Sequence, residues 1–177
     1  PEFVAMIEGC PAKVFFASKK LRWQKVDYVN IGVKKESLLK GNHWVYVPEK
    51  KYPFYRVSCP SNAAKYHAPK GKSALCVELS SKVYSLKKEK VILKAVIGFL
   101  KETGDIKSSK DLDFVEFKTI PTAYVIFDSN YSSCRRAILK YLRDEKVFSI
   151  GRYGAWEYSS LSKSVSAGRT IKELIGI

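Results

Sequence analysis

Short stretches of alternating or branched apolar residues, separated by turn signals, dominate the first half of the chain. They occupy residues 26–33, 43–48, 54–59 and 74–79. Side chains that alternate with a period of two fit a strand with one buried face. Short turns between such strands favour antiparallel neighbours. The spacing therefore predicts an antiparallel meander.

Helical patterns lie on both sides of this meander. Residues 1–22 read as helical, with Pro11 suited to a first turn. Apolar residues recur at helical spacing over 91–100, and they predict a helix with Ser85 as its N-cap and Gly104 at its end.

The last third of the chain alternates between the two patterns. Strand character returns over 114–127, with an interruption at Pro121, and Ser129 can cap a following helix. Residues 147–158 read as a strand that ends in a glycine-containing turn, and a last helix is predicted over about 164–174. The whole pattern predicts an α+β fold, an antiparallel or mixed sheet with helices packed on it.

The chain is strongly basic, with 32 Lys and Arg against 17 Asp and Glu and a net charge of +15 over 177 residues. A field of this sign attracts nucleotides, nucleic acid or acidic lipids without choosing among them. The basic residues are spread along the chain, which also fits an ordinary lysine-rich surface. No known nucleic-acid motif supports nucleic acid as the partner. The longest apolar run, 123–127, is far too short to cross a membrane.

The cysteines and histidines offer little chemistry. No C-x-x-C pairing occurs among Cys10, Cys59, Cys76 and Cys134, so we expect reduced, structural thiols. His43 and His67 lie in different segments, and we expect no metal site. The chain has no G-x-S-x-G nucleophile motif, so the sequence does not indicate a hydrolase. Without a visible signal peptide, a cytoplasmic location is expected.

The segment GRYGAWEY at 151–158 carries the most specific signal. Its two glycines allow a sharp turn and a close approach of a ligand to the main chain. Arg152 supplies a fixed cation that matches phosphate, and the N-terminus of the following helix favours an anion. The alternative is an aromatic-rich corner that fills the core, because Tyr153, Trp156 and Tyr158 are also suited to packing.

The GRYGAWEYSS segment, followed by Ser166-Ala167-Gly168, resembles the C-terminal flavin motif of the amine-oxidase-like flavoproteins. That superfamily includes monoamine oxidases, protoporphyrinogen oxidases and UDP-galactopyranose mutases. Upstream segments are similar to the mutase branch in particular. These are HWVYVPE at 43–49, PFYR at 53–56, PSN at 60–62 and AYVIFD at 123–128.

The resemblance implies roles for individual residues. The FAD-binding residues it implies are Gly151, Arg152, Tyr153, Gly154, Trp156 and Ser162. The substrate-binding residues it implies are Arg56, Tyr124, Arg152 and Tyr158. The two arginines and two tyrosines suit a diphosphate, because charge-assisted hydrogen bonds are the strong ones. The resemblance implies no catalytic residue in this chain, and Asn62 matches the family without an assigned role.

Two features depart from the family pattern. The chain has no G-x-G-x-x-G fingerprint of a dinucleotide-binding fold, and Lys163 stands where an acidic residue usually contacts the flavin. The chain therefore resembles the C-terminal part of such a protein. Residues 1–146 would form a substrate-binding α+β domain, and 147–177 a strand-turn-helix that returns to the FAD domain. We expect the isolated chain to be colourless and inactive.

Three functions remain open at this stage. The first is the C-terminal part of a flavin-dependent enzyme, either a UDP-galactopyranose mutase-like isomerase acting on a nucleotide sugar or an amine-oxidase-type oxidoreductase. Its partner would be the missing FAD domain or a separate flavin-carrying protein. The second is a non-catalytic module that binds an anionic ligand or a partner. The third is nucleic-acid binding driven by net charge, which we consider the weakest, and nothing indicates an oligomeric state.

Overall fold

The structure, a computed structural model, describes residues 1–36, 38–79 and 89–175. Its internal contacts define two compact units. Unit 1 consists of Pro1–Gln24 and Thr122–Ile177, and unit 2 consists of Lys25–Pro121. A five-stranded antiparallel sheet with helices packed on it confirms the predicted α+β class. The expected domain boundary between residues 146 and 147 concerns the return of the chain to an FAD domain, and it stays a prediction.

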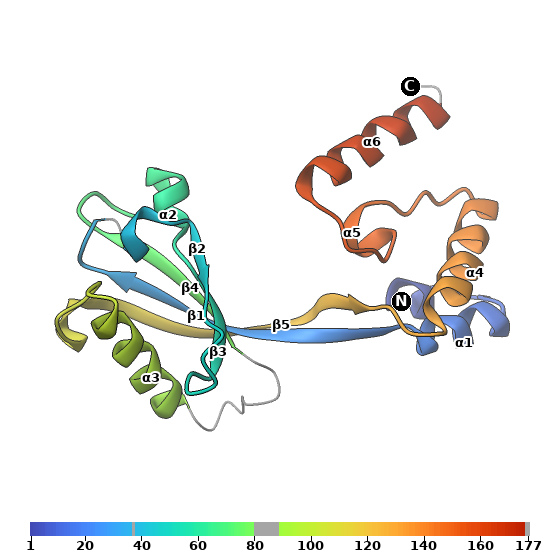
Figure 1. The fold of residues 1–177 in the computed structure, drawn as a ribbon. Coiled ribbons are helices and arrows are strands. Elements are labelled where there is room, and N and C mark those ends of the chain that lie inside the picture. Colours follow the sequence, from blue (N-terminus) through green and yellow to red (C-terminus); the bar gives the residue numbers. More distant parts are fainter. Residues whose placement is uncertain (37, 80–88, 176–177) are drawn as a thin grey trace. The chain divides into compact units, whose positions relative to one another are not determined.

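The sheet has the strand order β2-β3-β4-β1-β5 (Figure 1). Its strands are β1 (Arg22–Val33), β2 (Trp44–Tyr46), β3 (Phe54–Ser58), β4 (Ser73–Leu79) and β5 (Leu112–Ile126). β3 pairs with both β2 and β4, and β4 pairs with β1, all antiparallel. Each of the four stretches predicted as strands from the apolar alternation is therefore present.

The core of unit 2 lies between this sheet and α3 (Glu89–Glu102), which covers one face (Figure 1). Valine side chains form a buried row across the strands at Val29, Val57 and Val77. They pack with Ile92, Val96 and Leu100 of α3, which repeat at helical spacing as the sequence predicts. The helix ends before Gly104, also as predicted, whereas Ser85, the predicted N-cap, lies outside the described residues.

Several short helical turns connect the strands of unit 2. They are η2 (Leu39–Gly41), α2 (Pro60–Ala63), η3 (Lys65–His67) and η5 (Ser109–Asp111).

β5 continues through Pro121, so the predicted interruption of this strand is wrong. The physical reason is the position of β5 at one edge of the sheet. A proline lacks the N–H that a central strand would need, but at an edge this loss breaks no ladder hydrogen bond.

Unit 1 is built from helices around a second core. They are η1 (Phe3–Met6), α1 (Ala12–Lys20), α4 (Tyr131–Asp144), α5 (Gly151–Gly154) and α6 (Leu161–Ile175). The buried side chains of this core are Val4, Val14, Ala17, Leu21, Cys134, Ile138, Leu142 and Trp156. The predicted helix over 1–22 is thus two shorter helices, because Pro11 cannot continue a helix from the preceding turn.

The start of α4 also differs from its prediction. The side chain of Asp128, rather than Ser129, accepts hydrogen bonds from the N–H groups of Asn130 and Tyr131 at 3.0 and 3.1 Å. A carboxylate at this position satisfies free N–H groups and is favoured by the helix dipole.

The segment 147–150 forms no strand, which corrects the prediction of a strand over 147–158. The N–H of Val147 donates to the carbonyl of Leu142 at 2.7 Å, so the segment starts with a hydrogen bond to the C-terminal end of α4. A strand needs a neighbouring strand, and within the described residues no strand pairs with this segment. None of the helices in the described part of the chain combines the length and apolar character needed to cross a bilayer.

Candidate anion-binding site

The guanidinium of Arg152 lies among aromatic rings in unit 1. It is 5.1 Å from the ring centre of Tyr124 and 4.9 Å from that of Tyr158, and the two rings stack on each other at 6.1 Å. Tyr153 adds a more distant face at 6.0 Å. These distances are typical of cation–π contacts, which hold the guanidinium in place without neutralising its charge.

The charge of Arg152 has no carboxylate partner among the described residues. Its Nη2 donates to the carbonyl of Ala123 at 3.0 Å, and Ala123 is buried. A carbonyl accepts a hydrogen bond but carries no formal charge, so the guanidinium keeps donors and a full positive charge for a ligand. Tyr158 is 64% exposed, which leaves its hydroxyl accessible beside the cation. The arrangement suits an anion with several oxygens.

The backbone at this site turns through α5, which is formed by the GRYG residues themselves. Gly151 has φ +77°, a left-handed conformation that other residues rarely adopt. Gly154 is needed for a different reason, because a Cβ there would lie 3.0 Å from Oγ of Ser149. The close approach at Gly154 is therefore taken by a residue of the same chain rather than left open to a ligand.

The indole of Trp156 belongs to the core of unit 1. It is only 4% exposed and packs edge-on against Trp23, with ring centres 5.7 Å apart. The backbone of Trp156 is left-handed at φ +51°, which is unusual for a bulky residue. Trp156 therefore fills the core, as the alternative of an aromatic corner expects, whereas Tyr153 and Tyr158 remain exposed.

α4 holds the segment that links Arg152 to Tyr158. Tyr131 donates its hydroxyl to the carbonyl of Trp156 at 2.8 Å, and Arg135 donates Nε to the carbonyl of Ala155 at 2.5 Å. Arg135 also pairs with Glu157 at 3.5 Å, and Lys163 pairs with the other oxygen of Glu157 at 3.3 Å. These contacts fix residues 155–157 in addition to the chain's own turn hydrogen bonds.

The first turn of α6 is partly capped by its own serines. Oγ of Ser160 accepts from the N–H of Lys163 at 3.2 Å, and the hydroxyls of Ser160 and Ser162 lie 2.9 Å apart. α6 begins about one turn earlier than predicted because Ser160 supplies this cap. A cofactor phosphate at this terminus would have to compete with Ser160 for the N–H of Lys163.

Arg56, the remaining predicted substrate residue, lies in unit 2 on the sheet face opposite to α3. A register shift between Phe54 and Arg56 sends Phe54 into the core and turns Tyr55 and Arg56 to the other face. Nε of Arg56 donates to Glu78 at 2.8 Å, Nη2 contacts the same carboxylate, and the Tyr55 hydroxyl donates to it at 2.6 Å. Arg56 is therefore neutralised by Glu78, unlike Arg152.

The structure thus brings Tyr124, Arg152, Tyr153 and Tyr158 together in unit 1 and holds Arg56 in unit 2. No sequence signal indicated Glu78 or Arg135. An Arg–Glu pair on neighbouring strands leaves no local motif, because its residues are far apart in sequence. The binding roles assigned to Gly151, Gly154, Trp156, Ser162 and the other site residues stay predictions.

Solved structures place this fold among the flavoproteins that the sequence motifs resemble. A crystal structure of reduced UDP-galactopyranose mutase superposes with a TM-score of 0.73 at 26% identity, over 91% of this chain. A proposed protoporphyrinogen oxidase from Exiguobacterium superposes with a TM-score of 0.59 at 12% identity, over 89% of the chain, which shows a shared fold alone.

The chain spans about a third of each of these proteins, 35% in both cases. It therefore corresponds to a part of such a protein. No protein-family model and no curated protein sequence matches the chain.

Proposed function

We propose that this chain is the substrate-domain part of a flavin-dependent enzyme similar to UDP-galactopyranose mutase, and that Arg152 binds the diphosphate of a nucleotide sugar. The observation that supports this most is the Arg152 guanidinium, held by Tyr124, Tyr158 and a carbonyl but by no carboxylate among the described residues. The mutase superposition over 91% of the chain is consistent with it.

In this proposal each residue has a separate task. Arg152 provides the charge and donor fork for diphosphate oxygens. Tyr124 and Tyr158, which stack on each other, hold the guanidinium by cation–π contacts, and their hydroxyls would donate to the same oxygens. Arg56 lies in unit 2 and is already paired with Glu78, and its substrate-binding role stays a prediction.

Some of the residues implied to bind FAD are accessible to a flavin, and others are not. A Cβ added at Gly151 would meet only Oγ of Ser164, at 3.9 Å, and Tyr153 is 52% exposed. Gly154 is covered by Ser149, and Lys163 is paired with Glu157. When bound, FAD would supply the redox or nucleophilic chemistry, and the missing domain or a partner would supply most of its site. A cytoplasmic location stays a prediction.

The proposal is tested by calorimetric titration of the chain with UDP-galactose, UDP and benzylamine. We expect UDP and UDP-galactose to bind and benzylamine not to bind, because the site is built for an anion. Arg152→Ala should weaken UDP binding by roughly 30-fold, about 2 kcal/mol, since a charge-assisted contact to the diphosphate is lost.

The matched control is Arg136→Ala, which removes an exposed arginine of the same unit from α4. It should leave UDP affinity within a factor of two or so of the unchanged chain. Equal losses in both variants would show a non-specific charge effect and would contradict the proposal. Binding of benzylamine in preference to UDP would favour the amine-oxidase-type oxidoreductase instead.

The second candidate is a non-catalytic module that binds an anion without its own flavin. The observation that favours it is the covered Gly154, together with the Lys163–Glu157 pair at the place where the family contacts the flavin. In that case the chain should bind UDP equally well with and without a flavoprotein partner, and no activity should appear on mixing.

A further inference from the structure

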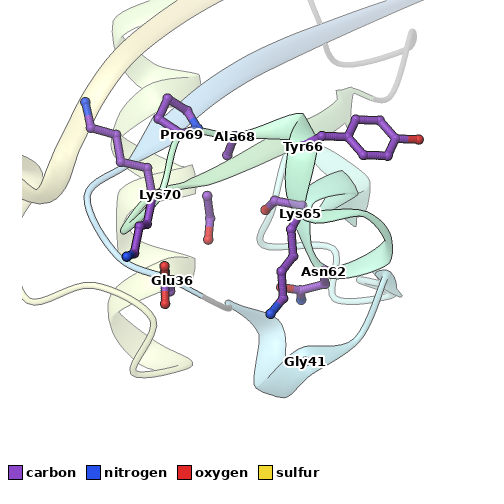
Figure 2. Close-up of a pocket in the computed structure, with 11 residues that line it drawn as sticks. Glu36, Gly41, Asn62, Lys65, Tyr66, Ala68, Pro69 and Lys70 are labelled. Carbon is purple, nitrogen blue, oxygen red and sulfur yellow. The ribbon is translucent and has the colours of Figure 1, made fainter.

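Unit 2 has a hollow of about 830 Å³ that lies outside the Arg152 site (Figure 2). It lies between the loop that follows β1 and the segment that connects β3 to β4. Its lining residues are Glu36, Gly41, Ser61, Asn62, Lys65, Tyr66, Ala68, Pro69, Lys70, Lys72 and Ser73. The volume is in the range of small-molecule sites.

The two walls of the hollow are joined by side-chain hydrogen bonds. Asn62 donates to the carbonyls of Leu38 and Asn42 at 2.7 and 2.8 Å. At the other end, Glu36 accepts the N–H of Gly71 at 2.8 Å, and Ser73, which is 2% exposed, donates to the carbonyl of Lys35 at 2.7 Å. These bonds hold the hollow open in a defined shape, so a ligand would not have to order it.

The loop that forms one wall is also strained. Leu39 and Lys40 both have left-handed backbones, at φ +54° and +53°. Leu39 is nonetheless buried, and its N–H donates to the Asp105 carboxylate at 2.8 Å. A left-handed conformation at two consecutive non-glycine residues persists only where the surrounding structure imposes it, and such strained positions cluster at functional sites.

The charges of the hollow are unequal. Lys72 pairs with Asp113 at 2.6 Å, but Lys65 and Lys70 have no ion-pair partner among the described residues. Figure 2 shows Lys70 near Glu36 at one end of the hollow and Lys65 near Gly41 at the other, whereas Tyr66 points away. Each ammonium group can donate charge-assisted hydrogen bonds to a phosphate oxygen. The Glu36 carboxylate repels a phosphate but accepts hydrogen bonds from hydroxyl groups.

We propose that this hollow is a binding site for a phosphomonoester of a polyhydroxylated compound, such as a sugar phosphate. Lys65 and Lys70 bind the phosphate, and Glu36 accepts hydrogen bonds from the hydroxyl groups. Ser61 and Asn62 shape the floor, because their side chains are already committed to Ala74 and to the opposite wall. The site uses no residue of the Arg152 site, and it stands or falls independently of the proposed function.

The test is a titration of the full chain with glucose 6-phosphate, inorganic phosphate and glucose, followed by backbone amide NMR. We expect glucose 6-phosphate to bind more tightly than inorganic phosphate, glucose to bind negligibly, and the largest shifts at Glu36, Lys65 and Gly71. Lys65→Ala and Lys70→Ala should each weaken binding about tenfold. Glu36→Gln should reduce the preference for glucose 6-phosphate over inorganic phosphate, because repulsion of phosphate and the strongest hydroxyl acceptor are both lost.

The matched controls are Lys50→Ala, an exposed lysine in the turn before β3, and Arg152→Ala in unit 1. Neither should change glucose 6-phosphate affinity. The proposal is overturned if no saturable binding occurs, if Lys50→Ala weakens binding as much as Lys65→Ala, or if Arg152→Ala abolishes it. The exposed lysine variants are not expected to unfold the chain. Glu36→Gln serves as a second check on specificity.

Discussion

Arg152, Arg56 and Arg135 differ in what balances their charge. Arg56 faces the Glu78 carboxylate, and Arg135 shares Glu157 with Lys163. Arg152 meets only aromatic faces and a carbonyl among the described residues. A guanidinium that is already paired gains little from a further anion, whereas an unpaired one offers its full charge. The partner, rather than the residue type, therefore marks Arg152 as the candidate.

Cys76 illustrates the effect of burial on a single residue. Burial, with a smaller contribution from the nearby Glu78 carboxylate, raises the pKa of its thiol from 9.0 to about 11. Because the thiolate is the nucleophile, we expect alkylation of Cys76 by iodoacetamide to be slow and to keep accelerating above about pH 9, where an ordinary thiol levels off. Mass spectrometry of the labelled peptide measures this rate against pH.

The same shift predicts a direction for stability. The folded state keeps the proton of the Cys76 thiol to higher pH than the unfolded chain does. The contribution of this thiol to the free energy of unfolding is therefore complete below pH 9 and declines as pH rises toward 11. The control for the labelling experiment is the chain unfolded in urea, in which the alkylation rate of Cys76 should follow the pH dependence of an ordinary thiol. Rapid labelling of folded Cys76 at neutral pH would contradict the burial seen here.

At the scale of elements, α4 supports the turn that carries Arg152. Its residues Tyr131 and Arg135 donate to consecutive carbonyls, at Trp156 and Ala155. The left-handed backbone of Trp156 falls within this supported stretch. Such strain persists only where other contacts hold it. We infer that α4 positions Tyr158 relative to Arg152.

Arg135→Gln should therefore weaken UDP binding although Arg135 is not placed at the ligand. We expect roughly a fivefold to tenfold loss, because the Ala155 carbonyl and Glu157 lose a charged partner and the turn can shift. Calorimetry measures the affinity, and thermal unfolding checks that the variant remains folded.

Two controls test this interpretation of Arg135. Arg136 lies next to Arg135 on α4 but is exposed, and Arg136→Gln should leave UDP affinity unchanged. In an Arg152→Ala background, Arg135→Gln should cause no further loss, since its effect passes through the turn. An additive loss in the double variant would mean that Arg135 acts elsewhere.

At the scale of the whole molecule, the length of the chain relative to the solved flavoproteins bears on cofactor binding. It spans about a third of the flavoproteins it resembles and contains no G-x-G-x-x-G segment. We expect the purified chain to be colourless, because Gly151 and Tyr153 alone would make few contacts with a flavin. Visible absorbance and flavin fluorescence after denaturation measure any retained cofactor.

A yellow preparation that keeps one flavin per chain through dialysis would contradict this expectation. Free FAD added to the chain and removed again by dialysis is the control for non-specific retention. The net charge of +15 makes this control necessary, because it attracts any polyphosphate at low salt.

The sequence by itself was sufficient for features that depend on neighbours along the chain. A period of two predicted four strands, helical spacing predicted α3, and the GRYG motif indicated the flavoprotein fold. These patterns are local, because a strand or helix repeats its burial over a few residues. Pro121 and the segment 147–150 were misread for the same reason, since an edge position or a missing partner strand is not visible locally.

Only the tertiary structure decided which charges are paired and which spaces are filled. Glu78 reaches Arg56 from a neighbouring strand, and Ser149 occupies the space beside Gly154. The hollow at Lys65 and Lys70 is formed by two loops that are distant in sequence. Binding chemistry depends on charge and space in three dimensions, and both are set by contacts between residues that carry no joint signal along the chain.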